Sequence, residues 1–122
     1  MLTVTGGQLS GTVRVPGDKS ISHRAALLAA LANGIGEIHG FLDAADTNAL
    51  LGALAQLGVT VERPSPTTVR IHGRGNAPFE TPDSPLDLGN SGTGLRLLAG
   101  VLAGRGTRAV LTGDASLRTR TK

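Results

Sequence analysis

One local pattern occurs twice in this chain and limits its fold more than any other feature. A glycine-rich, hydroxyl-bearing turn leads into an arginine and then an apolar Ala/Leu helix, first at residues 17–31 and again at residues 89–102. Self-similarity at this scale predicts a fold of repeated βαβ-like units. At 122 residues, the chain holds fewer than two of them.

Apolar periodicity and turn signals assign the elements of an α/β fold. Strands are expected at residues 2–5, 11–15, 35–39, 59–62, 68–72, 86–88 and 109–111, with a loop over 73–85. Helices are expected at residues 20–32, 47–57 and about 94–103. The second helix should start at Asp43, as its cap, with Asp46 favouring the positive helix end. After its first turn the first helix is apolar on nearly every face, which predicts burial on all sides. The third helix is again apolar on most faces.

Composition excludes several classes of chemistry. The chain has no cysteine, which removes disulfides, thiolate metal sites and a cysteine nucleophile. Its histidines (His23, His39 and His72) are widely spaced and lack metal-ligand spacing, so we expect them to be structural or solvated and expect no metal. No signal peptide or membrane-spanning run is visible, so we expect a soluble, cytoplasmic protein.

The charge balance indicates which partners to expect. The formal net charge of +3 favours anionic partners, without distinguishing small phosphates from polymers. Phe41 and Phe79 are the only aromatic residues, so the stacking platforms of a single-strand nucleic-acid binder are lacking. Eighteen glycines indicate many turns, or backbone that approaches a ligand closely.

The first glycine-rich turn combines groups suited to an anion. Lys19 supplies a point charge, Ser20 a hydroxyl, and Arg24 a planar fork one turn later, all at an expected helix N-terminus. A capped helix with solvated charges explains the same residues, so both interpretations stay open here. A nucleotide P-loop is rejected, because Asp18 separates Gly17 from Lys19 and the glycine spacing does not fit.

The second glycine-rich turn offers a similar set. Asn90, Ser91 and Thr93 can form hydrogen bonds with oxygen atoms, and Arg96 lies on the first turn of an apolar helix. Alone, the segment is explained as well by a tight strand-to-helix turn in which glycine provides φ > 0 and a hydroxyl caps the helix. Two such turns in one short chain favour convergent anion sites. No Ser-His-Asp order and no general base is evident.

Three blocks of sequence, at residues 16–25, 86–96 and 111–120, resemble in order and spacing those of the 5-enolpyruvylshikimate-3-phosphate synthase family. The resemblance implies an incomplete enolpyruvyl transferase fold, an inside-out α/β barrel of βαβαββ units. It also implies that residues 1–15 form strands of the other domain, while residues 16–122 form part of a substrate-binding domain.

The resemblance further implies transfer of the enolpyruvyl group from phosphoenolpyruvate to shikimate 3-phosphate, without a metal or organic cofactor. It assigns Lys19 to both substrates and to a catalytic role, and Ser20 and Arg24 to shikimate 3-phosphate. The residues assigned to phosphoenolpyruvate, besides Lys19, are Asn90, Gly92, Arg96 and Arg120. The expected partners are these two small molecules and the remainder of the enzyme, with no nucleic acid and no membrane.

The sister family, the UDP-N-acetylglucosamine enolpyruvyl transferases, has a Lys-Asn pair after the first turn and commonly a reactive cysteine. This chain has Lys19-Ser20 and no cysteine, which favours the shikimate branch. In the family, the second domain supplies the acidic proton-transfer residues, so we expect the chain alone to be inactive. The rival hypothesis is a non-catalytic anion-binding module or an inactive fragment.

Overall fold

The computed structural model describes residues 2–115 and has a mixed α/β architecture. Its helices are α1 (Lys19–Leu31), α2 (Ala45–Gln56) and α3 (Gly92–Arg105). Its strands are β1 (Asn33–His39), β2 (Thr60–Ser65), β3 (Thr68–Arg74), β4 (Leu86–Asp87) and β5 (Leu111–Thr112). All three predicted helices and the predicted strands after residue 33 are confirmed, with ends displaced by a few residues.

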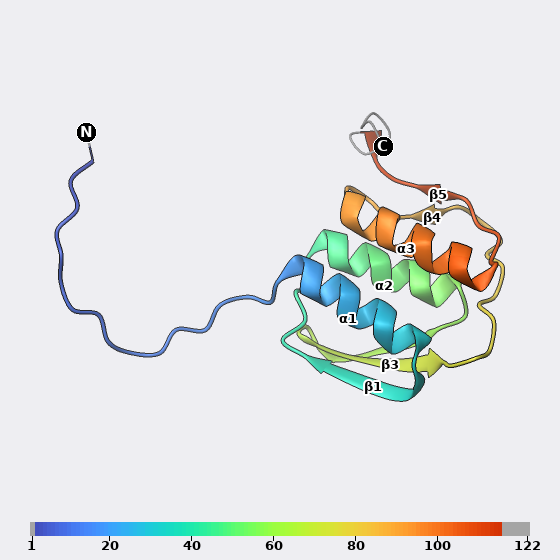
Figure 1. The fold of residues 1–122 in the computed structure, drawn as a ribbon, viewed down its shortest axis with the longest axis horizontal. Coiled ribbons are helices and arrows are strands. Elements are labelled where there is room, and N and C mark those ends of the chain that lie inside the picture. Colours follow the sequence, from blue (N-terminus) through green and yellow to red (C-terminus); the bar gives the residue numbers. More distant parts are fainter. Residues whose placement is uncertain (1, 116–122) are drawn as a thin grey trace.

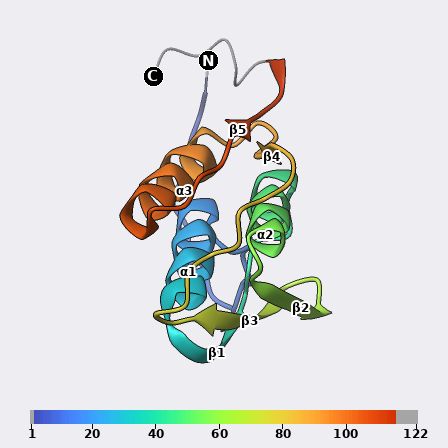
Figure 2. The same ribbon diagram turned by 90° about the vertical axis from the view of Figure 1, so that its right-hand side faces the viewer.

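The elements form layers, with the helices parallel to one another (Figures 1 and 2). Strands β1, β3 and β2, in that order, make an antiparallel sheet, and α1 and α2 cover one of its faces. Helix α3 packs on the other side of α1 and α2, beside the short strands β4 and β5. The N-terminal ends of all three helices lie at the same end of the molecule.

The second repeat forms a βαβ unit. Strand β4 pairs in parallel with β5, Leu86 opposite Leu111 and Asp87 opposite Thr112, and α3 is the crossover between them. A parallel pair requires such a crossover, because a tight turn can join only antiparallel strands. In the first repeat, α1 is followed by β1, which pairs with β3 from Asn33–Arg74 to His39–Thr68. The second turn-plus-helix segment is therefore part of a parallel βαβ unit, whereas among the described residues no strand precedes α1 and β1 pairs antiparallel with β3.

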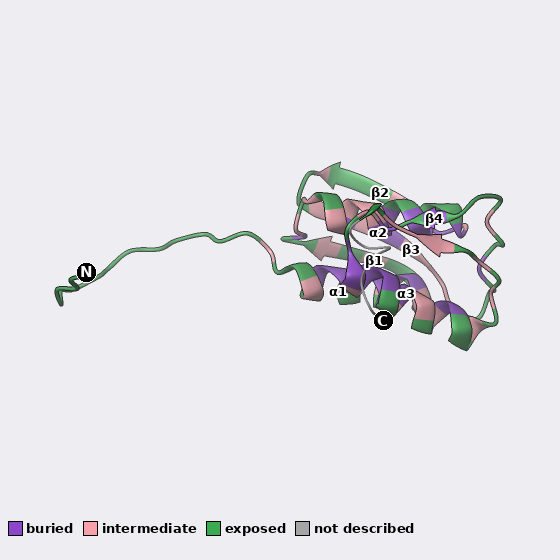
Figure 3. Cartoon of the chain, turned by 90° about the horizontal axis from the view of Figure 1, so that it is seen from above, coloured by how far each residue is buried: buried purple, intermediate pink, exposed green. Residues whose placement is uncertain are grey.

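The core lies between the sheet and the helices. The largest side chains that are completely buried are Phe41, Leu50, Leu54, Leu57, Ile71, Leu86, Leu88 and Leu98. Figure 3 shows this burial confined to the inner faces of the elements. On α1, Ile21 and Leu28 are 63% and 66% exposed, so the prediction of burial on all sides is wrong for this helix. Their face of α1 has no element of the described chain packed over it.

Residues 2–17 are extended and contain no strand, so the strands predicted at 2–5 and 11–15 are absent. This segment runs away from the folded part in Figure 1. Its apolar side chains are exposed, including Val4 at 83% and Val13 at 83%. A strand forms only where another strand satisfies its backbone groups, and no strand of the described residues pairs with this segment.

The start of α2 also differs from the prediction. The cap is Ala44, not Asp43, and the hydroxyl of Thr47 accepts a hydrogen bond from the Ala44 amide at 3.2 Å. Asp43 instead accepts a hydrogen bond from Asn48 at 3.0 Å and lies 3.4 Å from Arg63. A buried threonine at the third helical position thus replaces the expected aspartate cap.

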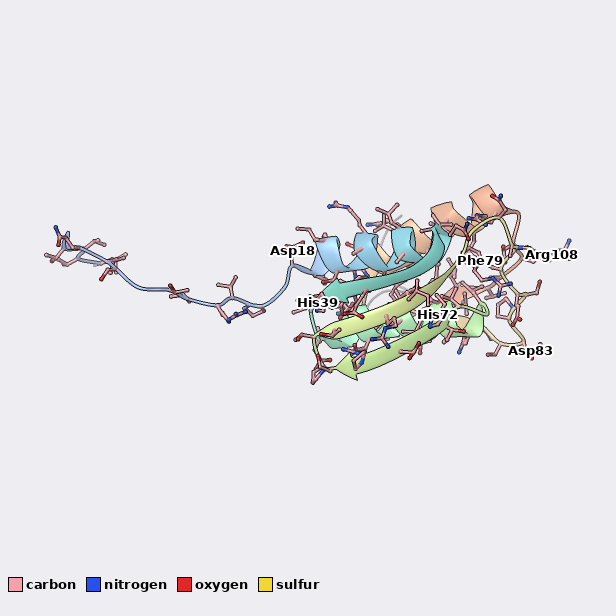
Figure 4. All side chains as sticks on the ribbon, turned by 90° about the horizontal axis from the view of Figure 1, so that it is seen from below. Asp18, His39, His72, Phe79, Asp83 and Arg108 are labelled. Atoms are coloured by element: carbon pink, nitrogen blue, oxygen red, sulfur yellow. The ribbon has the colours of Figure 1, made fainter. Side chains whose placement is uncertain are left out.

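The face of the sheet turned away from the helices is charged. His39 lies 2.9 Å from Glu37 and His72 lies 2.5 Å from Glu62, both in solvent-exposed positions on this face (Figure 4). The hydrogen bond from His72 lowers the pKa of Glu62 below its ordinary value. His39 ends β1 and directly precedes Gly40, whose carbonyl packs against Gly17 of the first glycine-rich turn. Within residues 2–115, no helix has the length and apolarity needed to cross a membrane.

Candidate anion-binding site

The turn before α1 is fixed by backbone packing. A Cβ atom added at Gly17 would lie 2.1 Å from the carbonyl oxygen of Gly40, so only glycine fits there. The hydroxyl of Ser22 donates to the Asp18 carbonyl at 2.7 Å and accepts from the Leu42 amide at 3.1 Å. These contacts hold the start of α1 against the loop that leads from β1 to α2.

Asp18 caps α1, because its carboxylate accepts a 2.8 Å hydrogen bond from the Ile21 amide. Lys19 is the first residue of the helix, and its Nζ lies 3.2 Å from Oδ2 of Asp46, on the first turn of α2. The side chain of Lys19 is 47% exposed, so a ligand can reach it. An exposed ion pair of this kind contributes only about 0.2–1 kcal/mol, which an anionic ligand can outweigh.

The turn before α3 is built differently. Ser91 caps α3 by accepting a 2.9 Å hydrogen bond from the Gly94 amide. The left-handed backbone of this turn is at Gly89, with φ of 59°, and the carboxylate of Asp87 accepts from the Gly89 amide at 2.9 Å. Gly92 has no positive φ, so the conformational explanation of this glycine-rich run applies to Gly89 and not to Gly92.

The two turns meet through His23. Its Nε2 lies 3.2 Å from the hydroxyl oxygen of Ser91, although the residues are 68 positions apart in the sequence. Both side chains are buried, His23 at 0% and Ser91 at 1% exposure. Burial lowers the pKa of His23 below its ordinary value, so the ring is neutral at pH 7. Lys19 acts in the same direction on this pKa, and Asp46 opposes both.

The two arginines remain available. Arg24 on α1 and Arg96 on α3 are exposed, and neither has a hydrogen bond or ion pair with any residue from 2 to 115. Arg24 borders an apolar groove of about 250 Å³ between α1 and α3, whose other lining residues are Leu27, Leu28, Leu31, Leu97 and Val101. Unpaired guanidinium groups of this kind suit carboxylate or phosphate ligands.

The structure thus gathers most of the predicted site residues at one end of the helix layer. Lys19 and Ser20 lie at the start of α1, and Asn90 and Gly92 at the start of α3, with the start of α2 beside them. Each helix N-terminus carries roughly half a positive charge and free amides. Arg120 lies outside the described residues, so its predicted role is untested.

Three carboxylates near the two turns have partners within the described chain. Asp18 caps α1, Asp46 pairs with Lys19, and Asp87 accepts from the Gly89 amide. These contacts give the three carboxylates structural roles, while the exposed cations Lys19, Arg24 and Arg96 are suited to anionic ligands.

The sequence interpretation missed two residues that organise the site. It assigned Asp46 only to the helix start. It expected His23 to be structural or solvated, which agrees with its burial but does not identify its partner Ser91. Their tertiary partners lie 27 and 68 positions away, which local patterns do not reveal. A histidine within an otherwise Ala/Leu helix, four residues after Lys19, is the one signal that could have indicated His23.

A sequence model of the family described as EPSP synthase (3-phosphoshikimate 1-carboxyvinyltransferase) matches residues 4–121. The chain is 53% identical over 112 residues to the 3-phosphoshikimate 1-carboxyvinyltransferase of Methylococcus capsulatus, covering 92% of this chain and 26% of that protein. It is 52% identical over 115 residues to that of Xanthomonas campestris, covering 94% of this chain and 26% of that protein.

The fold is similar to solved structures as well. It matches an EPSP synthase from Acinetobacter baumannii with a TM-score of 0.82 and 45% sequence identity, covering 90% of this chain and 25% of that one. The chain therefore spans about a quarter of the length of the relatives it matches.

Proposed function

The chain belongs to the EPSP synthase family, and we propose that it supplies part of the substrate site for enolpyruvyl transfer from phosphoenolpyruvate to shikimate 3-phosphate. The observation that carries the proposal is the meeting of the two glycine-rich turns, held by the 3.2 Å contact between His23 and Ser91. Two multiply charged substrates repel one another, and adjacent helix N-termini with cationic side chains offset that repulsion.

In this proposal the start of α1 binds shikimate 3-phosphate. Lys19 contacts both substrates, Ser20 donates its hydroxyl to the phosphate, and Arg24 adds a planar pair of donors. The half-exposed Lys19 and the unpaired Arg24 support these roles, because neither has to leave a buried protein partner before binding a ligand.

The start of α3 binds phosphoenolpyruvate. Gly92 lies against the ligand, Asn90 and Arg96 lie nearby, and Arg120 binds the anion. The exposed Arg96 and the absence of a side chain at the buried Gly92 support this assignment. No metal or organic cofactor takes part.

The transfer also needs proton transfer, which these residues do not supply together. A proton must reach the methylene carbon of phosphoenolpyruvate, and the 5-hydroxyl of shikimate 3-phosphate must lose one. We assign Lys19 to one of these steps. We assign the other step to carboxylates in the remaining length that the family's members have, of which this chain covers about a quarter.

We also propose a domain assignment. Residues 16–122 form part of the substrate-binding domain, and residues 1–15 contribute strands to the other domain. The exposed apolar side chains of Val4 and Val13 support this, since they alternate with polar residues as in a half-buried strand. We place the protein in the cytoplasm, with the two small molecules and the rest of the enzyme as its partners.

A chimera tests the proposed function. The equivalent quarter of the Methylococcus capsulatus relative is replaced by this chain, and phosphate released from phosphoenolpyruvate is measured with and without shikimate 3-phosphate. The chimera should release phosphate only when both substrates are present, and its Lys19→Met variant should not. The matched control Arg14→Met, in the exposed segment before α1, should keep its activity. The chain alone should show no turnover.

The second candidate is a non-catalytic anion-binding module, favoured by the engagement of the three carboxylates near the turns. It predicts that the chain binds shikimate 3-phosphate in calorimetry while the chimera stays inactive. An inactive chimera that nevertheless folds, as judged by its melting temperature, would decide for this alternative.

A further inference from the structure

His23 is an unusual residue to find in the core. It lies on the second turn of α1 with 0% of its surface exposed, and its Nε2 contacts the cap of α3, Ser91, at 3.2 Å. Among the buried side-chain nitrogen and oxygen atoms of residues 2–115, only its Nδ1 lacks a hydrogen-bond partner. We propose that His23 is a positioning residue whose ring fixes the start of α3 against the start of α1, so that the two anion-binding turns act on one pair of substrates.

The inference rests on the proposed function, because the two turns are those assigned to shikimate 3-phosphate and phosphoenolpyruvate. It adds a residue that contacts neither substrate and acts through Ser91 alone. A buried side chain is well suited to this task, since packing restricts its rotamers and leaves one geometry for the hydrogen bond.

Packing by itself does not account for a histidine here. A buried polar atom without a partner costs about 1–3 kcal/mol, and Nδ1 is such an atom. The other buried positions of α1 are Ser22, whose hydroxyl has two hydrogen-bond partners, and the apolar Ala26, Leu27 and Ala30. A leucine at position 23 would fill the space without an unpaired nitrogen. What the histidine provides and a leucine would lack is the hydrogen bond from Nε2 to the cap of α3.

The surroundings make this contact stiff. A Cβ atom added at Gly94 would lie 2.7 Å from Ser91 Oγ and 3.2 Å from His23 Cε1, so ring, hydroxyl and helix backbone are in close contact. The Ser91 hydroxyl in turn holds the Gly94 amide at 2.9 Å. A displaced ring therefore moves the cap, and a displaced cap moves the first turn of α3, where the amides face an anion.

The charges around the ring agree with this role. Lys19 on α1 and Asp46 on α2 act on His23, and its burial keeps the ring neutral at pH 7. A neutral ring can hold the hydroxyl without adding a third charge beside the Lys19–Asp46 pair. The histidine therefore contributes geometry, and the cations of the site remain Lys19 and the two exposed arginines.

The first test needs no ligand and uses the full 122-residue chain. Amide hydrogen exchange at Gly94 is compared in wild type, His23→Leu and His23→Gln, with His39→Leu on the exposed sheet face as the matched control. Loss of one hydrogen bond should raise the Gly94 exchange rate about tenfold in His23→Leu. In His23→Gln the side-chain amide can replace the hydrogen bond, so the exchange rate should lie within about threefold of wild type. The control should exchange like wild type.

The second test is calorimetric titration of shikimate 3-phosphate into the same variants, with melting temperatures measured beside it. Affinity should fall in His23→Leu and recover in His23→Gln, without following the melting temperatures. Unchanged Gly94 exchange in His23→Leu, or no recovery in His23→Gln, would overturn the role of His23. If neither the wild-type chain nor the chimera binds shikimate 3-phosphate, the proposed function is contradicted instead. The exchange experiment needs no ligand and does not depend on that function.

Discussion

The ammonium of Lys19 lies 3.2 Å from the carboxylate of Asp46, across the first turns of α1 and α2. This pair places the cation assigned to both substrates beside a negative charge that any anionic ligand must compete with. The lysine is 47% exposed and the aspartate 23% exposed, so water screens their attraction but does not remove it. The pair therefore holds Lys19 in position and lowers its net attraction for anions.

Asp46→Asn should strengthen binding of shikimate 3-phosphate, because it removes the competing charge and keeps the shape of the side chain. The expected gain is about twofold to fivefold, as for the loss of one exposed ion pair. Calorimetry at low and at physiological salt measures it, and the gain should shrink with salt. If Asp46→Asn weakens binding at both salt concentrations, the carboxylate orients Lys19 more than it competes with the ligand.

Gly92→Ala should weaken phosphoenolpyruvate selectively. Gly92 has no positive φ, so alanine is not excluded by the backbone conformation. The proposal places phosphoenolpyruvate against this glycine, where an added methyl group would intrude. We expect about a tenfold loss for phosphoenolpyruvate in the chimera, equivalent to about 1.4 kcal/mol, and little change for shikimate 3-phosphate. A fall in melting temperature with equal losses for both ligands would mean that the glycine serves only the fold.

Gly17→Ala should destabilise the fold by about 1–3 kcal/mol, because its Cβ atom would overlap the carbonyl oxygen of Gly40. Gly52→Ala is the matched control, since Gly52 is exposed on α2 with no atom within 4 Å of the added methyl group. That control should stabilise the chain by about 0.5–1 kcal/mol. Urea unfolding measures the free energy of unfolding of both variants. Equal changes in the two would show that the turn at Gly17 can shift to accommodate a Cβ atom.

The buried His23 predicts acid sensitivity. Burial lowers its pKa in the folded state below the ordinary value of 6.5, so the unfolded chain takes up a proton at higher pH than the folded chain does. Stability is therefore complete above about pH 6.5 and decreases as the pH falls towards the folded-state pKa. Between about pH 7.5 and pH 5.5, the free energy of unfolding in urea should fall more for wild type than for His23→Gln. Equal losses of unfolding free energy in the two proteins would mean that a group other than His23 causes the acid sensitivity.

Local sequence patterns were sufficient for most of the fold. The Ala/Leu run after Lys19 and the run after Gly92 form helices as predicted. Strands β2 and β3 form a hairpin, although its turn is at Pro66 and Thr67, while Pro64 and Ser65 lie in β2. Helix propensity and turn formation depend on residues a few positions apart, so a single sequence is enough to recognise them. The repeated turn-plus-helix pattern also predicted the parallel βαβ unit around α3.

The failures have a common physical cause, which is that partners distant in sequence decide the outcome. The segment at residues 11–15 has the alternation of a strand, but no partner strand lies among the described residues. Asp43 has the chemistry of a helix cap, but Arg63 and Asn48 hold its carboxylate elsewhere. The contact of His23 with Ser91 spans 68 positions and is invisible to any local pattern.

Calorimetric titration of shikimate 3-phosphate into the wild-type chain, Lys19→Met and Arg14→Met tests most directly whether the start of α1 is a substrate site. Loss of a charge-assisted contact at Lys19 should weaken binding by about 1.5–3 kcal/mol, or tenfold or more. Arg14 lies in the exposed segment before the turn, so its loss should cost less than about twofold. Equal losses for the two substitutions would contradict the assignment, because binding would then follow net charge and not the site.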